Sequence, residues 1–338
     1  MNHFPSPAAF EAALAALPPA STAARAAAEA RQSRLTKPAG SLGRLEDIAI
    51  FLAGWQQRER PKIERARAIV FAGNHGVVAR GVSAFPPGVT AQMVANFEAG
   101  GAAINALCLA AGIDLKVVAI DLDRPTADFA EAPAMSEAEC LAALNAGAAA
   151  VEADLDLLIL GEMGIGNSTA AAALCARSLG GDGALWVGPG TGVDAEGIAR
   201  KREAVDRALD LHRGAPATPF DTLRRVGGRE IAAIAGAVLR ARQAAIPVVL
   251  DGFICCSAVA PLHAAQPGIV AHCLAGHCSA EPGHARLLEQ LGLDPLLALD
   301  MRLGEASGAA VAAMVIRAAV AAHDRMATFD EASVSAGL

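Results

Sequence analysis

The sequence lacks any run of basic residues, and its 28 lysines and arginines are outnumbered by 35 aspartates and glutamates, which gives a formal net charge of −7. Nucleic acids and anionic membrane surfaces are therefore unfavourable partners. The longest stretch without a charged side chain, residues 252–280, is interrupted by Pro261, Pro267 and several histidines. These interruptions favour a buried core segment over a membrane span.

The N-terminal residues lack a basic region followed by an apolar core, so we expect no secretory signal. The seven cysteines are an odd number and lie mostly in apolar surroundings. A chain of 338 residues does not need disulfides for stability, and we expect reduced thiols in the cytoplasm. With 54% hydrophobic and 19% charged residues, the chain is expected to form one large domain with a small appendage.

Several catalytic and ligand-binding motifs are also missing. A Gly-x-x-x-x-Gly-Lys-Ser/Thr loop is absent, so a nucleoside triphosphate is not the first candidate ligand. The Gly-x-Ser-x-Gly turn of many serine hydrolases is absent too. The one cluster of metal-ligand residue types, residues 272–284, lacks the Cys-x-x-Cys spacing of structural zinc sites. We therefore expect no metal, and we interpret these histidines and cysteines as core residues.

The most informative stretch that is present runs from Asp156 to Ala173. A short apolar run is followed by a Gly-rich turn and then by an Ala-rich segment, which predicts a strand, a loop and a helix. Gly164 and Gly166 would let the backbone approach an oxyanion at the positive end of that helix, where Ser168 or Thr169 could cap the helix and donate to a phosphate. The alternative is a plain strand-to-helix turn without a ligand.

Short β-type runs alternate with helix-length segments from residue 67 onward. This alternation predicts an α/β fold with a doubly wound parallel sheet. We expect strands at residues 68–72, 115–120, 157–160, 184–187, 246–250 and 269–274. Ligands of such sheets bind outside the carboxyl ends of the strands.

Gly-rich or polar loops follow several of these runs, at residues 73–76, 82–88, 188–192 and 251–253. Together they predict a phosphate-and-sugar site at one edge of the sheet. Farther along, Glu305 lies near Gly304 and Gly308, at the start of an apolar helix that runs to about Ala322. Two interpretations remain open: Glu305 complements the helix dipole, or it is a water-shielded carboxylate that serves as a general base.

Seven sequence blocks follow one another along nearly the whole chain, at residues 37–46, 74–77, 87–93, 161–169, 250–253, 279–281 and 302–308. Each block is weak evidence alone, but the ordered set resembles the nicotinate-nucleotide–dimethylbenzimidazole phosphoribosyltransferase family, which makes the lower-ligand nucleotide of cobalamin. The resemblance implies a Rossmann-like sheet, a homodimer and no cofactor. It also implies an α/β catalytic domain at residues 61–305 and a small helical domain made of residues 1–60 with a C-terminal helix at about 306–338.

The resemblance also implies roles for individual residues. Glu305 corresponds to the general base and Glu162 to a second carboxylate of the site. The residues that correspond to the phosphate and nucleotide site are Gly164, Ile165, Gly166, Asn167, Ser168, Thr169, Gly188, Gly190, Thr191, Gly192, Lys201 and Gly252. Those that correspond to the acceptor pocket are Asn74, His75, Phe85, Gln92, Met93 and Leu303. Some members of the family carry a small polar residue in place of Phe85 and a Gln in place of Met93. Which base the protein accepts is therefore an open question.

The implied reaction moves the 5-phosphoribosyl group of nicotinate mononucleotide to 5,6-dimethylbenzimidazole and gives α-ribazole 5′-phosphate and nicotinate. Because nicotinate rather than pyrophosphate leaves, no magnesium site is required. Glycine loops suit the phosphate, and carboxylates suit the developing positive charge and the incoming N–H. Two alternatives are a transferase of the same fold that prefers a purine or phenol, and a non-catalytic protein that binds a nucleotide or benzimidazole.

Overall fold

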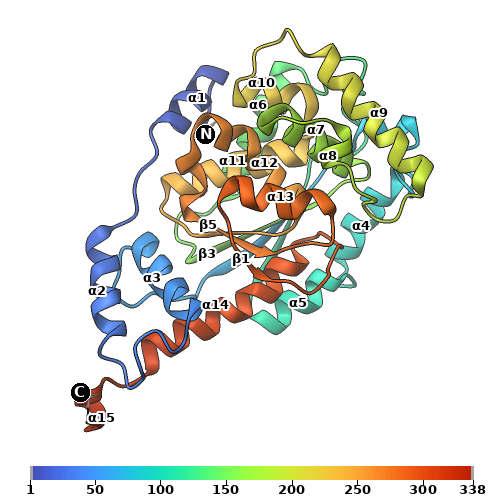
Figure 1. The fold of residues 1–338 in the computed structure, drawn as a ribbon. Coiled ribbons are helices and arrows are strands. Elements are labelled where there is room, and N and C mark those ends of the chain that lie inside the picture. The colour runs from blue at the N-terminus through green and yellow to red at the C-terminus, as the bar shows by residue number, and fades with distance from the viewer. Residues whose placement is uncertain (1–2, 336–338) are drawn as a thin grey trace.

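The computed structural model describes residues 3–335, and one parallel sheet lies at its centre (Figure 1). Within this range six strands pair in the order β2-β1-β3-β4-β5-β6. The strands are β1 (Ala66–Ala72), β2 (Asp114–Ala119), β3 (Leu157–Met163), β4 (Val248–Leu250), β5 (Cys273–His277) and β6 (Pro295–Leu297). Helices cover both faces, so the predicted α/β fold with a doubly wound parallel sheet is confirmed.

The central strand β3 faces two separate hydrophobic cores. Leu158 and Leu160 belong to the larger core on one face, and Leu157 and Ile159 belong to the smaller core on the other. Successive side chains of a strand point to opposite faces, so a strand that is covered on both sides needs an unbroken apolar run. The sequence Leu-Leu-Ile-Leu meets this need.

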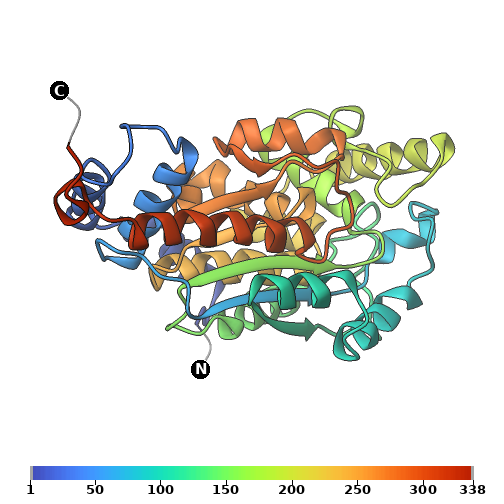
Figure 2. The ribbon, with the colours of Figure 1, turned by 90° about the horizontal axis from the view of Figure 1, so that it is seen from below.

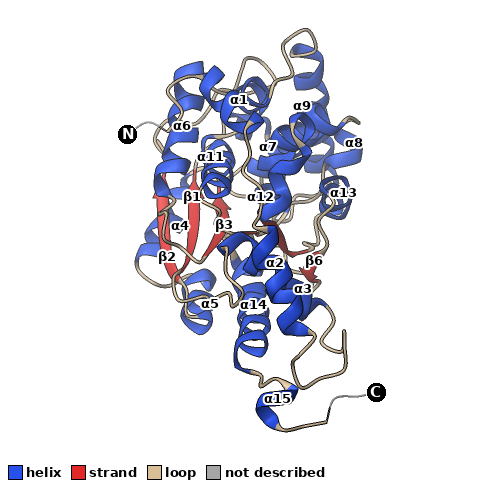
Figure 3. Ribbon diagram, turned by 90° about the vertical axis from the view of Figure 1, so that its left-hand side faces the viewer, coloured by secondary structure: helices blue, strands red, loops and turns tan. Residues whose placement is uncertain are grey.

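The helices form a layer on each face of the sheet (Figures 2 and 3). The larger core includes α1 (Pro7–Ala15), α6 (Glu137–Ala150), α7 (Asn167–Leu179), α8 (Gly183–Trp186), α9 (Ala195–Leu211), α10 (Pro219–Val226), α11 (Arg229–Gln243), α12 (Phe253–Ala265) and α13 (Pro282–Leu291). The smaller core includes α3 (Arg44–Gln56), α4 (Gly88–Glu98), α5 (Ala103–Ala111) and α14 (Ser307–Arg325). The remaining elements are α2 (Thr22–Gln32), α15 (Phe329–Ala332) and the 3₁₀ helices η1 (Gly76–Arg80) and η2 (Pro267–His272).

The strand order reverses between β1 and β3, because β1 is followed by β2 on one side while β3 and all later strands lie on the other. The loops after β1 and β3 therefore leave the sheet in diverging directions and open a crevice at its carboxyl edge. The two strand ends stay tied together, because the Gly73 N–H donates to the carbonyl oxygen of Met163 at 3.0 Å.

Two of the predicted strands differ from the structure. Residues 183–186 form the single-turn helix α8, whose N-cap Asp182 accepts a hydrogen bond from the Leu185 N–H and whose Trp186 is buried. Residues 267–272 form η2, which begins at Pro267, so β5 starts only at Cys273. Short apolar runs do not distinguish strands from buried helical turns, and this ambiguity explains both differences. The sequence interpretation also missed the edge strand β6, which begins with proline.

The two ends of the chain lie side by side. The Arg31 guanidinium of α2 donates to the carbonyl oxygens of His323, Asp324 and Met326, and Leu35 pairs with Thr328. Helix α1 lies apart from this cluster and packs against α10 (Figure 1). Helix α14 packs on β3, β5 and α5 as well as on α3. The division into a small domain of residues 1–60 and 306–338 and a catalytic domain of residues 61–305 stays a prediction.

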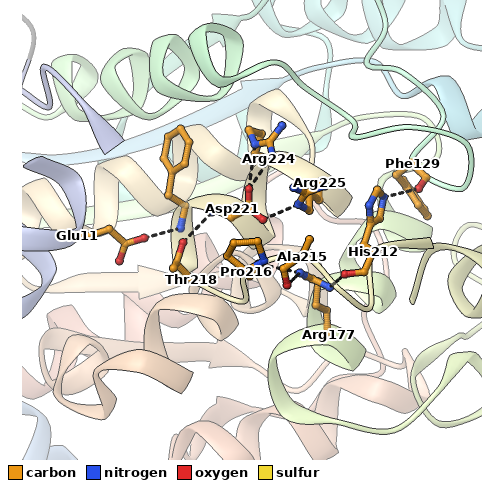
Figure 4. Close-up of polar contacts among 11 residues, drawn as sticks. Glu11, Phe129, Arg177, His212, Ala215, Pro216, Thr218, Asp221, Arg224 and Arg225 are labelled. Atoms are coloured by element: carbon orange, nitrogen blue, oxygen red, sulfur yellow. Dashed lines mark hydrogen bonds and ion pairs between the residues drawn. The ribbon is translucent and has the colours of Figure 1, made fainter. Parts of the chain in front are cut away.

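A polar network joins α7, α10 and the connection from α9 to α10 (Figure 4). Arg177, in the last turn of α7, donates to the carbonyl oxygens of His212, Ala215 and Pro216 in the connection from α9 to α10. In α10, Asp221 forms ion pairs with Arg224 and Arg225. These bonds join α7 to the end of α9, the helix that carries Lys201.

One described stretch, Gly88–Ala111, is long and apolar enough by composition to cross a bilayer. In the structure it consists of two helices, α4 and α5, which are separated at Gly100 and Gly101. Gly100 has a φ of +80°, a left-handed conformation that interrupts a helix. The stretch is therefore not one continuous helix.

Candidate active site

A cavity opens at the carboxyl edge of the sheet and encloses about 810 Å³ including its mouth. Its walls come from the ends of β3 and β5, the N-termini of α7 and α12, the residues 82–83 and 189–193, Lys201 of α9, and the residues 302–304 before α14. These segments are far apart in sequence and meet at the crevice beside the strand-order reversal. The position, at the carboxyl ends of the strands beside the reversal of strand order, suits a small-molecule site.

One wall is the loop that enters α7. Gly166 is the N-cap of this helix with a φ of +93°, and among the described residues no side chain caps it. The expectation that Ser168 or Thr169 caps the helix is therefore wrong, because both lie inside its first turn. Within that turn the Asn167 N–H donates to the Gly164 carbonyl oxygen at 3.2 Å and the Thr169 N–H to the Gly166 carbonyl oxygen at 3.1 Å. What the turn offers to an anion at the cavity wall is therefore the positive end of the helix dipole together with Ser168.

A buried lysine faces this loop from α9. Lys201 is 2% exposed, and its Nζ donates to the Ser168 hydroxyl and to the Gly188 carbonyl oxygen, both at 2.9 Å. Burial lowers the pKa of Lys201 from its ordinary value. Gly190 lies close by, since a Cβ at that position would be 3.0 Å from the Lys201 Nζ. The predicted phosphate loops and Lys201 thus meet at one point of the cavity.

Two carboxylates predicted for catalysis lie together beside the start of α7, where the Asn167 side-chain amide donates to the Glu162 carboxylate. Glu162 lines the cavity at the end of β3, and Glu305 lies next to the lining residue Gly304, with its N–H donating to the Glu162 carbonyl oxygen at 3.2 Å. Burial is the main reason that the pKa of Glu162 is raised to about 8, with further contributions from the nearby carboxylates of Asp251 and Glu230. Burial also raises the pKa of Glu305 to about 7. Both groups can exchange protons near neutral pH.

The cavity brings together most of the residues predicted for the nucleotide. Those that line it are Gly164, Ile165, Gly166, Asn167, Ser168, Gly190, Thr191, Lys201 and Gly252. Thr169, Gly188 and Gly192 lie beside lining residues without facing the cavity themselves. Thr169 is fully buried, and its hydroxyl has no hydrogen-bond partner among the described residues.

The residues predicted for the acceptor pocket are more scattered. Only Leu303 lines the cavity, and it is 50% exposed. Phe85 is also exposed, in the loop after Ser83, which is itself a lining residue. Met93 is half-buried on α4, and Gln92 faces solvent.

The last two acceptor residues are buried away from the cavity. Asn74 donates to the Leu122 carbonyl oxygen at 2.9 Å. His75 lies 2.6 Å from the fully buried Glu230 carboxylate. Neither residue lines the cavity, so any effect of these two on a ligand passes through their neighbours.

Sequence reasoning assigned no role to four polar residues that line the cavity: His277, Ser279, Glu281 and Arg302. The first three occupy alternate positions at and after the end of β5, so they face the same side by the period of an extended chain. That alternation is the signal that could have found them. Burial raises the pKa of Glu281 and lowers that of His277.

Thiols and metal-ligand groups contribute no further site. The seven cysteines, all within residues 3–335, are free, and all but Cys278 are buried. Within the same residues, no group of three or more His, Cys, Asp or Glu side chains is arranged to hold a metal ion.

Comparison with known proteins places this geometry in a family. Residues 17–334 match the family described as "Phosphoribosyltransferase". A nicotinate-nucleotide–dimethylbenzimidazole phosphoribosyltransferase from Novosphingobium aromaticivorans is 70% identical over the full length of both chains. One from Rhodobacter capsulatus is 58% identical over 95% of each chain. The crystal structure of CobT from Thermus thermophilus superimposes with a TM-score of 0.87 at 44% identity and covers 93% of this chain and 100% of its own. The chain therefore belongs to the nicotinate-nucleotide–dimethylbenzimidazole phosphoribosyltransferase family.

Proposed function

We propose that this chain transfers the 5-phosphoribosyl group of nicotinate mononucleotide to 5,6-dimethylbenzimidazole, giving α-ribazole 5′-phosphate for the nucleotide loop of cobalamin. The observation that carries the proposal is one cavity at which the N-terminus of α7 and the buried Lys201 lie close to the Glu162 and Glu305 carboxylates. The names of the close relatives support the same reaction.

The donor phosphate is proposed to bind at the N-terminus of α7, to the N–H and hydroxyl of Ser168 and to the Lys201 ammonium. A phosphate dianion compensates the charge of Lys201, which in the free protein has only neutral hydrogen-bond acceptors, the Ser168 hydroxyl and the Gly188 carbonyl. The arrangement supplies both a backbone donor and a full positive charge, which together give tight and oriented phosphate binding. Fixing the phosphate fixes the ribose carbon at which the glycosidic bond breaks.

The two carboxylates are proposed to act on two different centres of positive charge in the transition state. Departure of nicotinate leaves positive charge on the ribose, which an ionised Glu162 stabilises. Attack by one benzimidazole nitrogen makes the N–H of the other nitrogen acidic, and Glu305 accepts that proton. Attack from the face opposite nicotinate converts a β nucleotide into an α nucleotide.

The acceptor is proposed to bind between the loop that carries Phe85 and the segment that carries Leu303. Both side chains are apolar and about half exposed, at 46% and 50%, so a flat aromatic base would cover surface that now faces water. Met93 adds apolar surface from α4. Asn74, His75 and Gln92 are proposed to support this pocket through the backbone rather than by touching the base.

We also propose that the protein is a cytoplasmic homodimer. Its free, buried cysteines suit a reducing compartment. The outer side of α5 supports an interface with a second copy, because Leu109 on α5 is 85% exposed and Met314, on the neighbouring α14, is 37% exposed. Exposed apolar side chains on adjoining helices favour association between chains.

The test of the reaction is product formation from nicotinate mononucleotide and 5,6-dimethylbenzimidazole, followed by chromatography. We expect α-ribazole 5′-phosphate and an equal amount of nicotinate. Parallel reactions with a purine and with a phenol identify a transferase that prefers another acceptor. Binding of both substrates without any product would instead identify a non-catalytic binding protein and would overturn the proposal.

A further inference from the structure

The turn that carries Glu305 has an unusual backbone. Gly304, Glu305 and Ala306 have φ values of +83°, +61° and +65°, and the last two are not glycine. Left-handed conformations are unfavourable for residues with a Cβ, and they persist only where the surrounding structure enforces them. Something must therefore hold this turn in place.

The group that holds the turn comes from another strand. Asp251 directly follows β4 and is fully buried, and its Oδ1 accepts a hydrogen bond from the Ala309 N–H in the first turn of α14 at 2.9 Å. The other oxygen of this carboxylate, Oδ2, is buried without a hydrogen-bond partner among the described residues. Among the described residues, the N-cap Ala306 provides no side-chain cap, so Asp251 replaces the missing cap.

Backbone packing fixes the same turn against the sheet. A Cβ on Gly161 of β3 would lie 2.3 Å from the Ala306 nitrogen, and a Cβ on Gly276 of β5 would lie 2.7 Å from the Ala309 Cα. The start of α14 thus lies directly on the strands that flank β4. This packing holds the start of α14 close to the sheet. The Asp251 carboxylate is the polar group that contacts the first turn of the helix.

We propose that Asp251 is a positioning residue: by capping α14 from beneath, it holds the left-handed turn that aims the Glu305 carboxylate at the acceptor base. The inference rests on the proposed role of Glu305 as the general base. Asp251 does not line the cavity, so it affects the reaction through neighbouring residues: through the position of Glu305 and, by its charge, through the raised pKa of Glu162.

The charge of Asp251 has a second consequence for Glu305. The titratable groups packed around this turn are Glu162 from β3, Asp251 after β4, and His277 from β5, whose Nε2 lies 3.6 Å from the Asp251 Oδ1. Glu230 lies behind Glu162. An ionised Asp251 disfavours ionisation of Glu305, because two like charges in a buried site repel each other. Removal of that charge should therefore lower the pKa of Glu305.

The experiment compares Asp251→Asn and Asp251→Ala, each alone and combined with Glu305→Gln, in the full-length protein. Asn keeps an oxygen that can accept the Ala309 N–H and loses the charge, whereas Ala loses both. We expect turnover to fall about 10-fold for Asn and about 100-fold for Ala, while the KM for nicotinate mononucleotide changes by less than about 2-fold. In Asp251→Asn the rise of kcat with pH should also move to lower pH.

The Glu305→Gln background distinguishes an effect of Asp251 on the position of Glu305 from an effect on the structure of the whole site. Without a carboxylate to position, Asp251→Ala should lower the residual turnover by less than about 2-fold, because coupled residues are not additive. The matched control is Asp156, which is also buried and accepts backbone N–H bonds from Glu64 and Arg65 at 3.0 Å. Asp156→Asn should lower the melting temperature without any change in the pH profile.

Three results would overturn the inference. One is a folded Asp251→Asn enzyme with normal turnover and an unmoved pH profile. Another is an equal loss from Asp251→Ala in the wild-type and Glu305→Gln backgrounds, which would identify a purely structural role. The third is near-normal turnover of Glu305→Gln alone, which would remove Glu305 as the base and, with it, the reason to position that residue.

Discussion

At the scale of single residues, the site is dominated by carboxylates that burial holds near neutral pKa values. The pKa of Glu162 is raised to about 8 and those of Asp251 and Glu305 to about 7, in each case mainly because water is excluded. Three like charges cannot all form in one buried site at low cost, so protons are shared among them. When positive charge develops on the ribose of the bound donor, that charge favours the ionised form of all three carboxylates.

The first prediction at this scale concerns Glu305. If Glu305 is the base, Glu305→Gln should bind both substrates nearly normally while turnover falls about 10²–10⁴-fold, the usual cost of removing a general base. In the wild type, kcat should rise as pH increases through about 7, because only the carboxylate form accepts a proton. The rise near pH 7 should disappear in the variant and leave only a rise near pH 8, where Glu162 ionises.

Steady-state kinetics of both substrates across pH would measure these effects, with folding checked by thermal melting. Glu162→Gln serves as the comparison and should lose less turnover if Glu162 only stabilises charge. A Glu305→Gln enzyme with near-normal turnover would make Glu162 the leading candidate for the base.

The carboxylates also illustrate what sequence could predict about single residues. Glu305 was identifiable because glycines and apolar residues surround it in the sequence itself, whereas Glu162 was assigned only through the family resemblance. The role of Asp251 was not identifiable, because its partner Ala309 is more than 50 positions away and meets it only through strand order. Likewise, Ser168 and Thr169 suggested a cap, whereas the left-handed Gly166 occupies that position.

At the scale of elements, the loop into α7 has to bring its backbone close to a phosphate. Gly166 allows this approach because it has a φ of +93° and because a Cβ there would lie 2.6 Å from a methyl group of Val78. A second contact fixes the loop from the acceptor side, since the Ile165 N–H donates to the buried Thr90 hydroxyl of α4 at 3.2 Å. The phosphate and acceptor sides of the cavity are therefore physically linked.

This geometry predicts that Gly166→Val weakens nucleotide binding specifically. The loss of one hydrogen bond to a charged group costs about 1.5–3 kcal/mol, so the KM for nicotinate mononucleotide should rise about 10- to 100-fold. The KM for the benzimidazole should change far less. Initial-rate kinetics with each substrate varied in turn would measure both constants.

Gly180, at the other end of the same helix, offers a matched control. It also has a left-handed φ, +85°, but a Cβ there would have nothing within 4 Å. Gly180→Val should therefore lower the melting temperature through backbone strain while both KM values stay normal. If a folded Gly166→Val enzyme also kept both constants, the phosphate would have to bind elsewhere.

Element by element, the sequence pattern was reliable where a strand is long. The runs that became β1, β2 and β3 were correctly located, because each is an apolar segment followed by a glycine or polar loop. Residues 184–187 failed as a strand because a capping aspartate and the bond from the Trp186 indole N–H to the Gly180 carbonyl oxygen stabilise a helical turn. Such local hydrogen bonds override an apolar run of four residues.

At the scale of the whole molecule, the strand order explains why one edge of the sheet collects the site. The reversal between β1 and β3 separates their loops, and every later strand adds its own loop on the same side. The alternation of strands and helices predicted this edge. It could not predict which face of the molecule would stay apolar and exposed, because that depends on how α4, α5 and α14 pack together.

The last prediction concerns that exposed face. Leu109 is 85% exposed on α5, which packs beside α14 (Figure 2). If this face contacts a second copy, light scattering should give twice the chain mass for the wild type. Burial of one leucine contributes about 1.5–3 kcal/mol, so Leu109→Glu should raise the dimer dissociation constant at least about 10-fold. Leu211→Glu, at an exposed leucine on α9, is the control and should leave the dimer intact. A wild-type protein with the mass of one chain at micromolar concentration would exclude the dimer, and a dimer unaffected by Leu109→Glu would place the interface on another face.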